Sequence, residues 1–347
     1  MQLLIENWKL YLYAMAAAGA ISFLATPVIR ALALRFGWMD IPASVKTHKI
    51  ATPSLGGVAI FAAFVGTLFL LRLWTHFPTG TLRSLRALIL GGTIIFVLGI
   101  VDDLKKPQGL HFKLKFVVQF LSACVLVFYD IRIHFMSPDY LSMGLTLFWV
   151  VGITNAFNII DIMDGLSASQ AVIAALCLLM ISLPSEELYV NFASATLAGA
   201  AIGFLPWNMS AKRKIFMGDS GSLLLGFLLS GIAMGTRYSD VNSLGVYAPL
   251  FMLMVPIYDT LFVMVLRLAQ GKSPFLGSKD HFALRLEKMG YSRGEIVRLA
   301  VGASTFLGFC AFLVTQLSAM WALFIYVMVI IEVLILSHAL AQVMMND

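Results

Sequence analysis

Charged residues are scarce in this chain of 347 residues, because Asp, Glu, Lys and Arg together make up only 12% of it. Soluble globular domains carry about 25%. Hydrophobic residues account for 60% and the mean hydropathy is +0.90, so polar side chains are too few to cover a water-facing surface. This composition excludes a soluble globular protein and predicts an integral membrane protein surrounded by the lipid bilayer.

Several other features are missing. The three cysteines lie in apolar runs without zinc or redox spacing, and the six histidines form no paired ligand pattern, which argues against a zinc or disulfide centre. The start of the chain lacks a basic region followed by a cleavage site, so we expect no cleaved signal peptide. Without repeats or a soluble segment, residues 1–347 are expected to form a single transmembrane domain, with no nucleic-acid partner.

What the chain has instead is a series of apolar stretches of spanning length. Such a stretch needs about 20 mostly apolar residues, and lipid offers no partner for a free backbone amide, so each one must be helical. The predicted fold class is therefore all-α, a polytopic integral membrane protein with about 10–11 transmembrane helices. The eleven candidates centre near residues 20, 63, 93, 122, 148, 175, 198, 228, 256, 308 and 331.

Basic residues set the expected orientation, because Lys and Arg are enriched in cytoplasmic loops. With eleven spans and the N-terminus outside, 18 of the 24 basic residues fall on the inside, which places the C-terminus in the cytoplasm. Attraction to anionic headgroups explains part of this bias, and a polyanionic substrate would explain more. We expect the active site in the inside loops, which cover about 31–54, 102–115, 155–166, 207–219 and 268–297.

The unusual polar residues fall on this same inner face. Ionisable groups near membrane depth are costly and usually mark function. Helix-end solvation would explain any one cluster, but five clusters on one face indicate a site. They are "KTHKIATPSLGG" (46–57), "GIVDDLKK" (99–106), "NIIDIMDGLS" (158–167), "FMGDSGS" (216–222) and "SPFLGSKDHFALRL" (273–286).

Carboxylates beside lysines suit a divalent cation held between protein and phosphate. Mg²⁺ typically takes one or two carboxylates, waters and substrate phosphate oxygens, and phosphoryl transfer depends mostly on positioning and charge neutralisation. Asp219 is expected at a helix start, where flanking glycines would let a ligand approach free N–H groups. A simple N-cap is the plainer interpretation of the same residues.

The segment "NIIDIMDGLS" continues a polar series in which Asn155, Asn158, Asp161 and Asp164 are spaced three apart. A helix turns about 100° per residue, so the first and last of these would point to opposite sides of one continuous helix. We therefore predict that the helix ends near Asp161 and that Gly165 helps the chain turn back over the same pocket. The paired amides and carboxylates suit a base or ribose, although an ordinary polar hairpin has the same pattern.

Asp259 differs from these residues because it lies inside a span, after Pro256. Two placements are open, one deep beside the pocket and one paired with a basic group such as Arg267. A buried carboxylate also keeps a membrane transporter among the alternatives. Transporter sites, however, lie near the midplane of inverted repeats, which this sequence lacks.

Taken together, "VDDL", "NAFNIIDIMDGLS", "FMGDSGSLLLGF", "PIYDT" and "GKSPFLGSKDHFALRL" resemble, in order, the motifs of a known family. It is the polyprenyl-phosphate N-acetylhexosamine-1-phosphate transferases (glycosyltransferase family 4), related to the phospho-N-acetylmuramoyl-pentapeptide translocase. The resemblance implies a multi-pass enzyme of the bacterial plasma (inner) membrane with a cytoplasmic active site. Such an enzyme transfers a sugar 1-phosphate from a UDP-sugar to undecaprenyl phosphate with Mg²⁺ (or Mn²⁺) and releases UMP. A homodimer is common in the family.

Residue roles follow from the same resemblance. The implied catalytic residues are Asp102, Asp103 and His281, and the implied metal ligand is Asp219. The implied substrate-binding residues are Lys49 near the diphosphate, Asn158, Asp161, Asp164 and Asn208 around the nucleotide, and Arg285, which shares a sugar-reading loop with His281.

Two departures from the family pattern leave the sugar open. Ile162 stands where the family often has glycine, and the sugar loop, residues 281–286, keeps one histidine of three. The preserved Arg-Leu and "PIYDT" favour GlcNAc-1-phosphate transfer for envelope polysaccharide synthesis over phospho-N-acetylmuramoyl-pentapeptide transfer. A non-catalytic scaffold and a CDP-alcohol phosphotransferase, whose DG-x-x-AR signature is missing, are the remaining alternatives. Direct attack and a covalent phospho-enzyme both remain open.

Overall fold

The computed structural model describes residues 2–42, 50–75, 77–273, 278–343 and 345. Lys49 and the middle of the "SPFLGSKD" segment lie outside these residues. The helices are α1 Gln2–Phe36, α2 Gly57–Trp74, α3 Thr79–Leu104, α4 Phe112–Phe128, α5 Asp139–Ile159, α6 Leu166–Ser182, α7 Leu188–Asn208, α8 Asp219–Ala233, η1 Ser243–Tyr247, α9 Ala248–Met252, α10 Met254–Ala269, α11 Phe282–Lys288, α12 Arg293–Gln316 and α13 Ala319–Ala341. Two short antiparallel strands, β1 Met39–Asp40 and β2 Thr52–Pro53, form the one sheet among the described residues.

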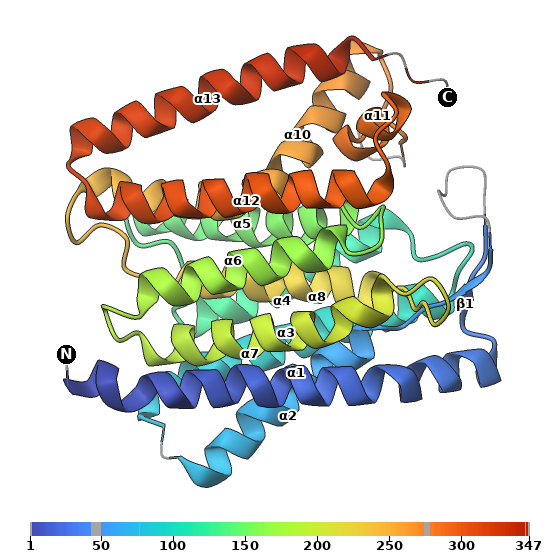
Figure 1. The fold of residues 1–347 in the computed structure, drawn as a ribbon. Coiled ribbons are helices and arrows are strands. Elements are labelled where there is room, and N and C mark those ends of the chain that lie inside the picture. Colours follow the sequence, from blue (N-terminus) through green and yellow to red (C-terminus); the bar gives the residue numbers. More distant parts are fainter. Residues whose placement is uncertain (1, 43–49, 76, 274–277, 344, 346–347) are drawn as a thin grey trace.

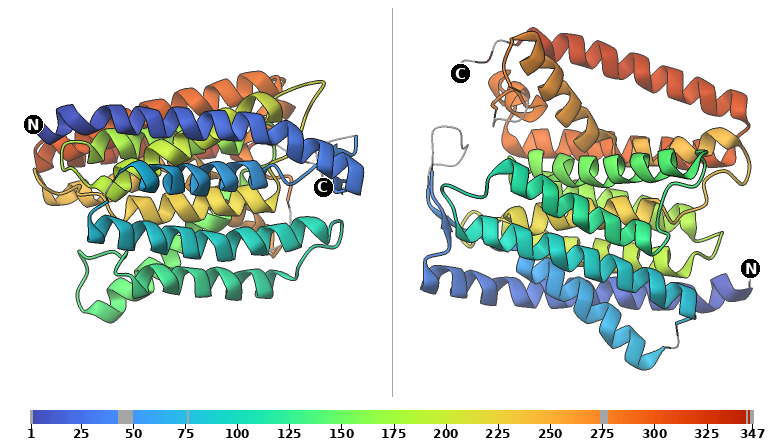
Figure 2. Two further views of the ribbon diagram at one scale, coloured as in Figure 1. Left: turned by 90° about the horizontal axis from the view of Figure 1, so that it is seen from below. Right: turned by 180° about the vertical axis from the view of Figure 1, so that it is seen from behind.

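Most helices lie side by side and run between the same two ends of the molecule (Figures 1 and 2). All eleven predicted span centres fall within helices, which confirms the all-α membrane fold. Helix α1 begins at one end of the bundle, and α13 ends at the other, near α11 (Figure 1). This arrangement agrees with an odd number of crossings.

Helix length separates two groups within the bundle. Among the described residues, seven helices are long and apolar enough to span a membrane, and the pair Ser243–Met252 and Met254–Ala269, bent by 74°, makes an eighth span if counted as one. The other predicted spans, α4, α6 and α8, have 17, 17 and 15 residues. They are shorter than expected, and α6 and α8, which are both largely buried, are covered mainly by protein rather than lipid.

Small residues allow α1 and α7 to pack backbone to backbone. A Cβ atom added to Gly199 would lie 2.0 Å from the carbonyl oxygen of Met15, and one added to Gly203 would lie 2.2 Å from that of Gly19. Gly199 and Gly203 are four residues apart on one helix face, the spacing that lets membrane helices approach closely. This contact holds α7 in the core, where 78% of the residues in its most apolar stretch are buried.

Helix α8 occupies the centre of the bundle, with every residue from Ser220 to Ala233 buried. Two neighbouring helices approach its first turn through glycine. A Cβ atom on Gly57 would lie 2.2 Å from the Gly221 nitrogen, and one on Gly99 would lie 2.4 Å from the Ser220 Cα atom. Gly99 precedes the end of α3 by five residues, so the start of α8 is recessed about 7 Å from that helix end.

We expect Gly203→Ala to lower the thermal unfolding midpoint of the detergent-solubilised protein, because the new methyl group would force α1 away from α7. Overpacking of this kind costs about 1–3 kcal/mol. The matched control is Gly66→Ala in α2, whose added Cβ meets no atom within 4 Å. It should leave the midpoint unchanged or raise it slightly, since alanine favours helix more than glycine does. Equal midpoints for the two variants would contradict the packing account.

Candidate active site

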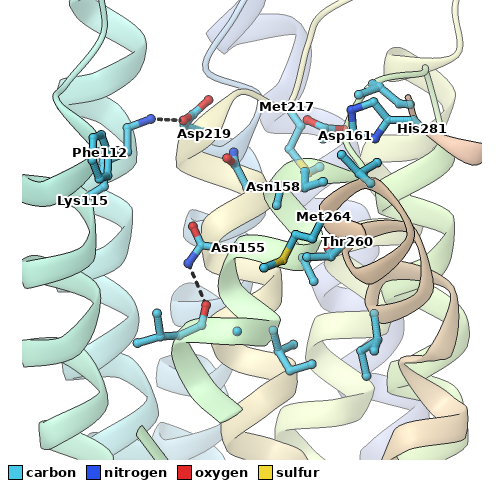
Figure 3. Close-up of a pocket in the computed structure, with 18 of the residues that line it drawn as sticks. Phe112, Lys115, Asn155, Asn158, Asp161, Met217, Asp219, Thr260, Met264 and His281 are labelled. Atoms are coloured by element: carbon cyan, nitrogen blue, oxygen red, sulfur yellow. Dashed lines mark hydrogen bonds and ion pairs between the residues drawn. The ribbon is translucent and has the colours of Figure 1, made fainter. Parts of the chain in front are cut away.

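A cavity of about 1320 Å³ opens where α4, α5 and α8 bring polar residues together, among them Lys115, Asn158 and Asp219 (Figure 3). Its charged side chains include Lys115, Asp161, Asp219 and His281, which lie toward one end of the close-up. Its other walls are apolar and aromatic, contributed mainly by α4, α5 and α10. Pockets for drug-sized ligands usually measure about 300–1,000 Å³, so this cavity has room for a larger or a second ligand.

The carboxylate of Asp103, near the end of α3, binds the start of α8. One oxygen accepts the Asp219 amide at 3.0 Å, and the other accepts the Ser220 amide at 3.0 Å. These amides belong to the first turn of a helix, where they have no partner within the helix. The N-cap residue of α8 is Gly218, which supplies no side-chain cap. Asp103 therefore caps α8 from a different helix and fixes the position of Asp219.

Glycine at position 218 is a condition of this contact. Gly218 has a φ of +73°, and a Cβ atom there would lie 2.4 Å from an Asp103 carboxylate oxygen. The segment before it is held by the "TPSLGG" turn. The Phe216 amide donates to the Pro53 carbonyl at 2.8 Å, and the Gly57 amide donates to the Met217 carbonyl at 2.8 Å. The motifs "TPSLGG" and "MGDSGS" thus form one backbone scaffold around Asp219.

Two lysines close the acidic cluster. Lys115 Nζ lies 2.7 Å from Asp102 Oδ2 and 2.8 Å from Asp219 Oδ2, and Figure 3 shows its ammonium group directed at Asp219. Lys106 Nζ lies 2.7 Å from Asp103 Oδ1 and 3.3 Å from Asp219 Oδ1. The described cavity lining includes Asp219 but neither Asp102 nor Asp103, which lie behind the lysines. The predicted catalytic pair is therefore adjacent to the cavity rather than on its surface.

The charges of this cluster set the protonation of its neighbours. Burial lowers the pKa of Lys106, but attraction to Asp219 and Asp103 outweighs burial and holds that pKa above its usual value, so Lys106 stays positive. Burial raises the pKa of Asp161 to about 8, and the negative charge of Asp219 adds to the effect. The Asp161 carboxyl therefore keeps its proton to higher pH than an ordinary aspartate and is able to donate a hydrogen bond.

The donor set fits a magnesium ion that substrate helps to hold. Among the described residues, no group of three or more His, Cys, Asp or Glu side chains is arranged to bind a metal by itself. Mg²⁺ rarely uses such a cage, because it retains waters and takes one or two carboxylates together with substrate phosphates. Asp219 offers hard carboxylate oxygens on the cavity wall, where 16% of its side chain is exposed. Asp102 shares Lys115 with it.

The predicted break in the polar series after α5 is confirmed. Helix α5 ends at Ile159, two residues before Asp161, and a turn leads directly into α6. Gly165 adopts a φ of +79° and is the N-cap of α6, so it makes the turn that the sequence indicated. Because of this turn, Asn158, Asp161 and Asp164 all line the same cavity.

Hydrogen bonds hold this turn in place. The side chain of Asn208 accepts the Gly165 amide at 2.6 Å and donates to the Ile215 carbonyl at 3.1 Å. Asn158 donates to the Ser222 hydroxyl at 2.9 Å, and Lys214 Nζ lies 2.5 Å from Asp164 Oδ2. Asn208 also lines the cavity, so it joins the turn to the segment before α8 at the site itself.

Asp259 pairs with His281 and not with Arg267. One of its carboxylate oxygens lies 2.7 Å from His281 Nδ1, and the other accepts the Phe282 amide at 3.0 Å. Arg267 instead donates to the Ser273 carbonyl at 2.7 Å. His281 lines the cavity, which settles the position of Asp259 directly behind it.

Arg285 is absent from the described cavity lining. It is 2% exposed and forms an ion pair with Asp280 at 2.8 Å. Its guanidinium also donates to the carbonyls of Leu340 and Val343, at 3.1 and 2.5 Å, where α13 ends. In this structure Arg285 thus satisfies free carbonyl groups at a helix C-terminus and ties α13 to the loop that carries His281.

Sequence reasoning did not assign several residues of this site. Lys106, Lys115, Lys214 and Asp40 all line the cavity. Lys106 could have been found from its place three residues after Asp103, one helical turn away. The pairing of β1 with β2 sets Asp40 opposite Thr52 and brings it to the site. No local sequence pattern predicts this pairing.

Comparison with known sequences identifies the family of this chain. The sequence profile of glycosyl transferase family 4 matches residues 85–237. A Bacillus subtilis protein named probable undecaprenyl-phosphate N-acetylglucosaminyl 1-phosphate transferase is 31% identical over 326 residues, covering 90% of this chain and 87% of that protein. The chain belongs to glycosyl transferase family 4.

Other members of glycosyl transferase family 4 match over shorter lengths. The decaprenyl-phosphate N-acetylglucosaminephosphotransferase of Mycobacterium tuberculosis is 33% identical over 315 residues, 81% of this chain and 76% of that protein. The phospho-N-acetylmuramoyl-pentapeptide-transferase of Streptococcus suis is 31% identical over 244 residues, 63% of this chain and 72% of that protein. The family model covers α4 to α8 and most of α3, the helices that carry the acidic cluster.

We expect Asp259→Asn to lower the pKa of His281. Burial lowers this pKa, but attraction to Asp259 and the hydrogen bond raise it above the ordinary value. The stability that the pair contributes is therefore fully present below the unfolded-state pKa, about 6.5, and is lost as pH rises through the higher folded-state value. Without the carboxylate the pKa should fall, because the lowering effect of burial is then opposed only by Asp280 and the Ser278 backbone. NMR titration of labelled histidines measures the change, and the other histidines serve as controls.

We expect Arg285→Gln to destabilise the protein, because it leaves Asp280 buried without its cation and frees the α13 carbonyls. Breaking a buried ion pair costs about 3–5 kcal/mol, which thermal unfolding in detergent detects as a clear drop in midpoint. The control is Arg237→Gln, which breaks the pair with Glu187, where the arginine side chain is 67% exposed. An exposed pair contributes about 0–1 kcal/mol. A wild-type midpoint for Arg285→Gln would show that the hydrogen bonds from Arg285 to the α13 carbonyls do not stabilise the protein.

Proposed function

We propose that this protein transfers an N-acetylhexosamine 1-phosphate, in particular GlcNAc-1-phosphate, from a UDP-sugar to undecaprenyl phosphate. UMP is released, and the undecaprenyl-diphospho-sugar product serves cell-envelope polysaccharide synthesis. One observation carries the proposal: a single cavity joins an end with lysines around Asp219 to apolar walls between membrane helices. Membership of glycosyl transferase family 4 and the names of the relatives support it.

The reaction is a transfer between phosphates. A phosphate oxygen of the lipid attacks the β-phosphorus of the UDP-sugar, and a new P–O bond forms. The bond between that phosphorus and the oxygen bridging to the α-phosphate breaks, and UMP leaves with the electron pair. A phosphate monoester has a second pKa near 6, so the acceptor is largely a dianion at pH 7 and needs no strong general base. The protein must chiefly offset repulsion between two polyanions.

The residues around α8 suit this task. Asp219 would hold a magnesium or manganese ion, and Asp102, which contacts the same lysine, Lys115, is a further carboxylate beside it. A bound Mg²⁺ polarises phosphoryl oxygens as a Lewis acid. Lys106 and Lys115 supply positive charge beside the place where phosphates would lie. Asp103 keeps Asp219 in position through the helix cap.

The remaining parts of the cavity divide between the two substrates. Asn158, Asp161, Asp164 and Asn208 line the wall proposed to bind the base and ribose, because they offer both donors and acceptors. The apolar walls, to which Phe120 and Phe148 contribute, would take the start of the prenyl chain. The role of Lys49 near the diphosphate stays a prediction, since that residue lies outside the described part of the chain.

The location and assembly of the protein are part of the same proposal. The site end of the bundle carries Lys106, Lys115 and Lys214, which the positive-inside rule assigns to the cytoplasm. We place the protein in a bacterial plasma membrane with its active site facing the cytoplasm, where UDP-sugars are made. Association as a homodimer, expected from the family resemblance, is also a proposal.

The second candidate function is transfer of phospho-N-acetylmuramoyl-pentapeptide, because a relative with that name is 31% identical to this chain. That match covers 63% of the chain, against 90% for the relative named for N-acetylglucosaminyl 1-phosphate. The two reactions make and break the same bonds and differ in the donor sugar. A panel of donors therefore separates them.

The test is UMP release by the purified full-length protein with undecaprenyl phosphate and a panel of UDP-sugars. We expect release with UDP-GlcNAc and Mg²⁺, and none after removal of divalent cations. Asp219→Asn should reduce the rate roughly 100-fold or more, since metal polarisation of phosphoryl oxygens is worth several kcal/mol. Release only with the muramoyl-pentapeptide donor would select the second candidate.

The matched control is Asp139→Asn, the same chemical change at the other end of the bundle, where the carboxylate side chain is 79% exposed. This variant should keep wild-type activity. No UMP from any donor, together with uptake of labelled UDP-sugar into proteoliposomes, would overturn the transferase in favour of a transporter. Accumulation of a phosphorylated enzyme would instead establish a two-step route.

A further inference from the structure

Both carboxylate oxygens of Asp219 already contact an ammonium group. Oδ2 lies 2.8 Å from Lys115, and Oδ1 lies 3.3 Å from Lys106. A divalent cation bound to either oxygen would approach to about 2.0–2.1 Å in the case of Mg²⁺, into the space next to these ammonium groups. The lysines and the cation therefore compete for the same atoms.

The charges of the cluster point the same way. Asp102, Asp103 and Asp219 face Lys106 and Lys115, so with all three carboxylates ionised the two ammonium groups leave one net negative charge. A divalent cation entering alone would reverse the sign of this partly buried cluster, and like charges in such surroundings repel strongly. The diphosphate of a UDP-sugar carries two negative charges and would restore the original balance. Cation and donor should thus stabilise each other.

The two lysines differ in how firmly Asp219 holds them. Lys106 lies closer to Asp103, at 2.7 Å, than to Asp219, at 3.3 Å, and Asp103 is fixed by the α8 amides. Lys115 Nζ lies at nearly equal distances from the carboxylates of Asp102 and Asp219, 2.7 and 2.8 Å. Asp102 also accepts the Leu110 amide, so it keeps a partner if Lys115 moves. Lys115 is the group that is free to leave Asp219.

We propose that Lys115 occupies Asp219 in place of a divalent cation until the donor arrives, so that the cation and the UDP-sugar bind cooperatively. When the cation binds Asp219, the Lys115 ammonium turns to the donor's phosphate oxygens. The positive charges of the cation and of Lys115 are then balanced by the diphosphate of the donor. This inference rests on the proposed function, because it assumes a donor with a diphosphate. It adds a positioning role for Lys115 that controls when the cation is held.

The test is a titration of the full-length protein with Mn²⁺, in which electron paramagnetic resonance measures the bound metal. The titration is done with and without UDP-GlcNAc, and without the lipid acceptor so that no turnover occurs. In the wild type, the donor should tighten Mn²⁺ binding markedly. Lys115→Met removes the competing charge, so it should tighten Mn²⁺ binding without donor by about 10-fold and reduce the tightening that the donor adds; couplings of 5–150-fold are typical. Lys115→Arg keeps the charge and should leave donor-free binding weak.

The matched control is Lys113→Met, which removes the same charge from the same helix at an exposed position. It should change Mn²⁺ binding less than twofold, a shift too small to count as coupling. Unchanged or weaker donor-free binding in Lys115→Met would overturn the inference. So would equal effects of the two methionine variants. If Lys115→Met does not fold, tight donor-free binding by the wild type would equally overturn it.

Failure of this inference is distinguishable from failure of the proposed function. Wild-type protein that releases UMP, while Lys115→Met binds Mn²⁺ no more tightly, contradicts only the role of Lys115. Wild-type protein that releases no UMP from any UDP-sugar contradicts the proposed function, whatever the Mn²⁺ titration shows.

Discussion

The capping of α8 by Asp103 is the interaction on which the rest of the site depends. A helix that begins inside a membrane bundle exposes amides that water cannot reach, and each unsatisfied amide would cost several kcal/mol. Asp103 accepts two of these amides from a neighbouring helix, so a charged group can be fully buried with hydrogen bonds to both oxygens. The first residue of that capped helix is Asp219, which is thereby held at the cavity wall.

Close backbone packing makes this cap geometrically accessible. Gly57 and Gly99 bring α2 and α3 against the first turn of α8, and Gly218 leaves room for the Asp103 carboxylate. Charge then accumulates in one place, because the carboxylates on α3 and α8 require counter-ions, which Lys106 and Lys115 provide. The same concentration of charge that holds these side chains together equips the site for a cation and a diphosphate. Structure and proposed chemistry therefore share one set of contacts.

Local patterns predicted the helices, their apolar spans and the turn after α5, because hydropathy and the 100° step of a helix determine them within a short window. They also brought Asn158, Asp161, Asp164 and Asp219 to one cavity. The contacts of Asp103 with the α8 amides, of Asp259 with His281 and of Arg285 with the α13 carbonyls could not be predicted, since each joins segments 20 or more residues apart and depends on packing. Arg285 shows the consequence: its sequence position suggested a sugar contact, while its hydrogen bonds stabilise the end of α13.

Hydrogen–deuterium exchange of the first turn of α8 tests the central claim most directly. In Asp103→Ala the amides of Asp219 and Ser220 lose their acceptors, so exchange in the peptide covering 216–222 should accelerate by about 10-fold or more, as expected for a loss of roughly 1.4 kcal/mol or more. Asp102→Ala removes the neighbouring carboxylate without touching these amides and should leave that peptide protected. Equal protection in wild type and Asp103→Ala would contradict the account.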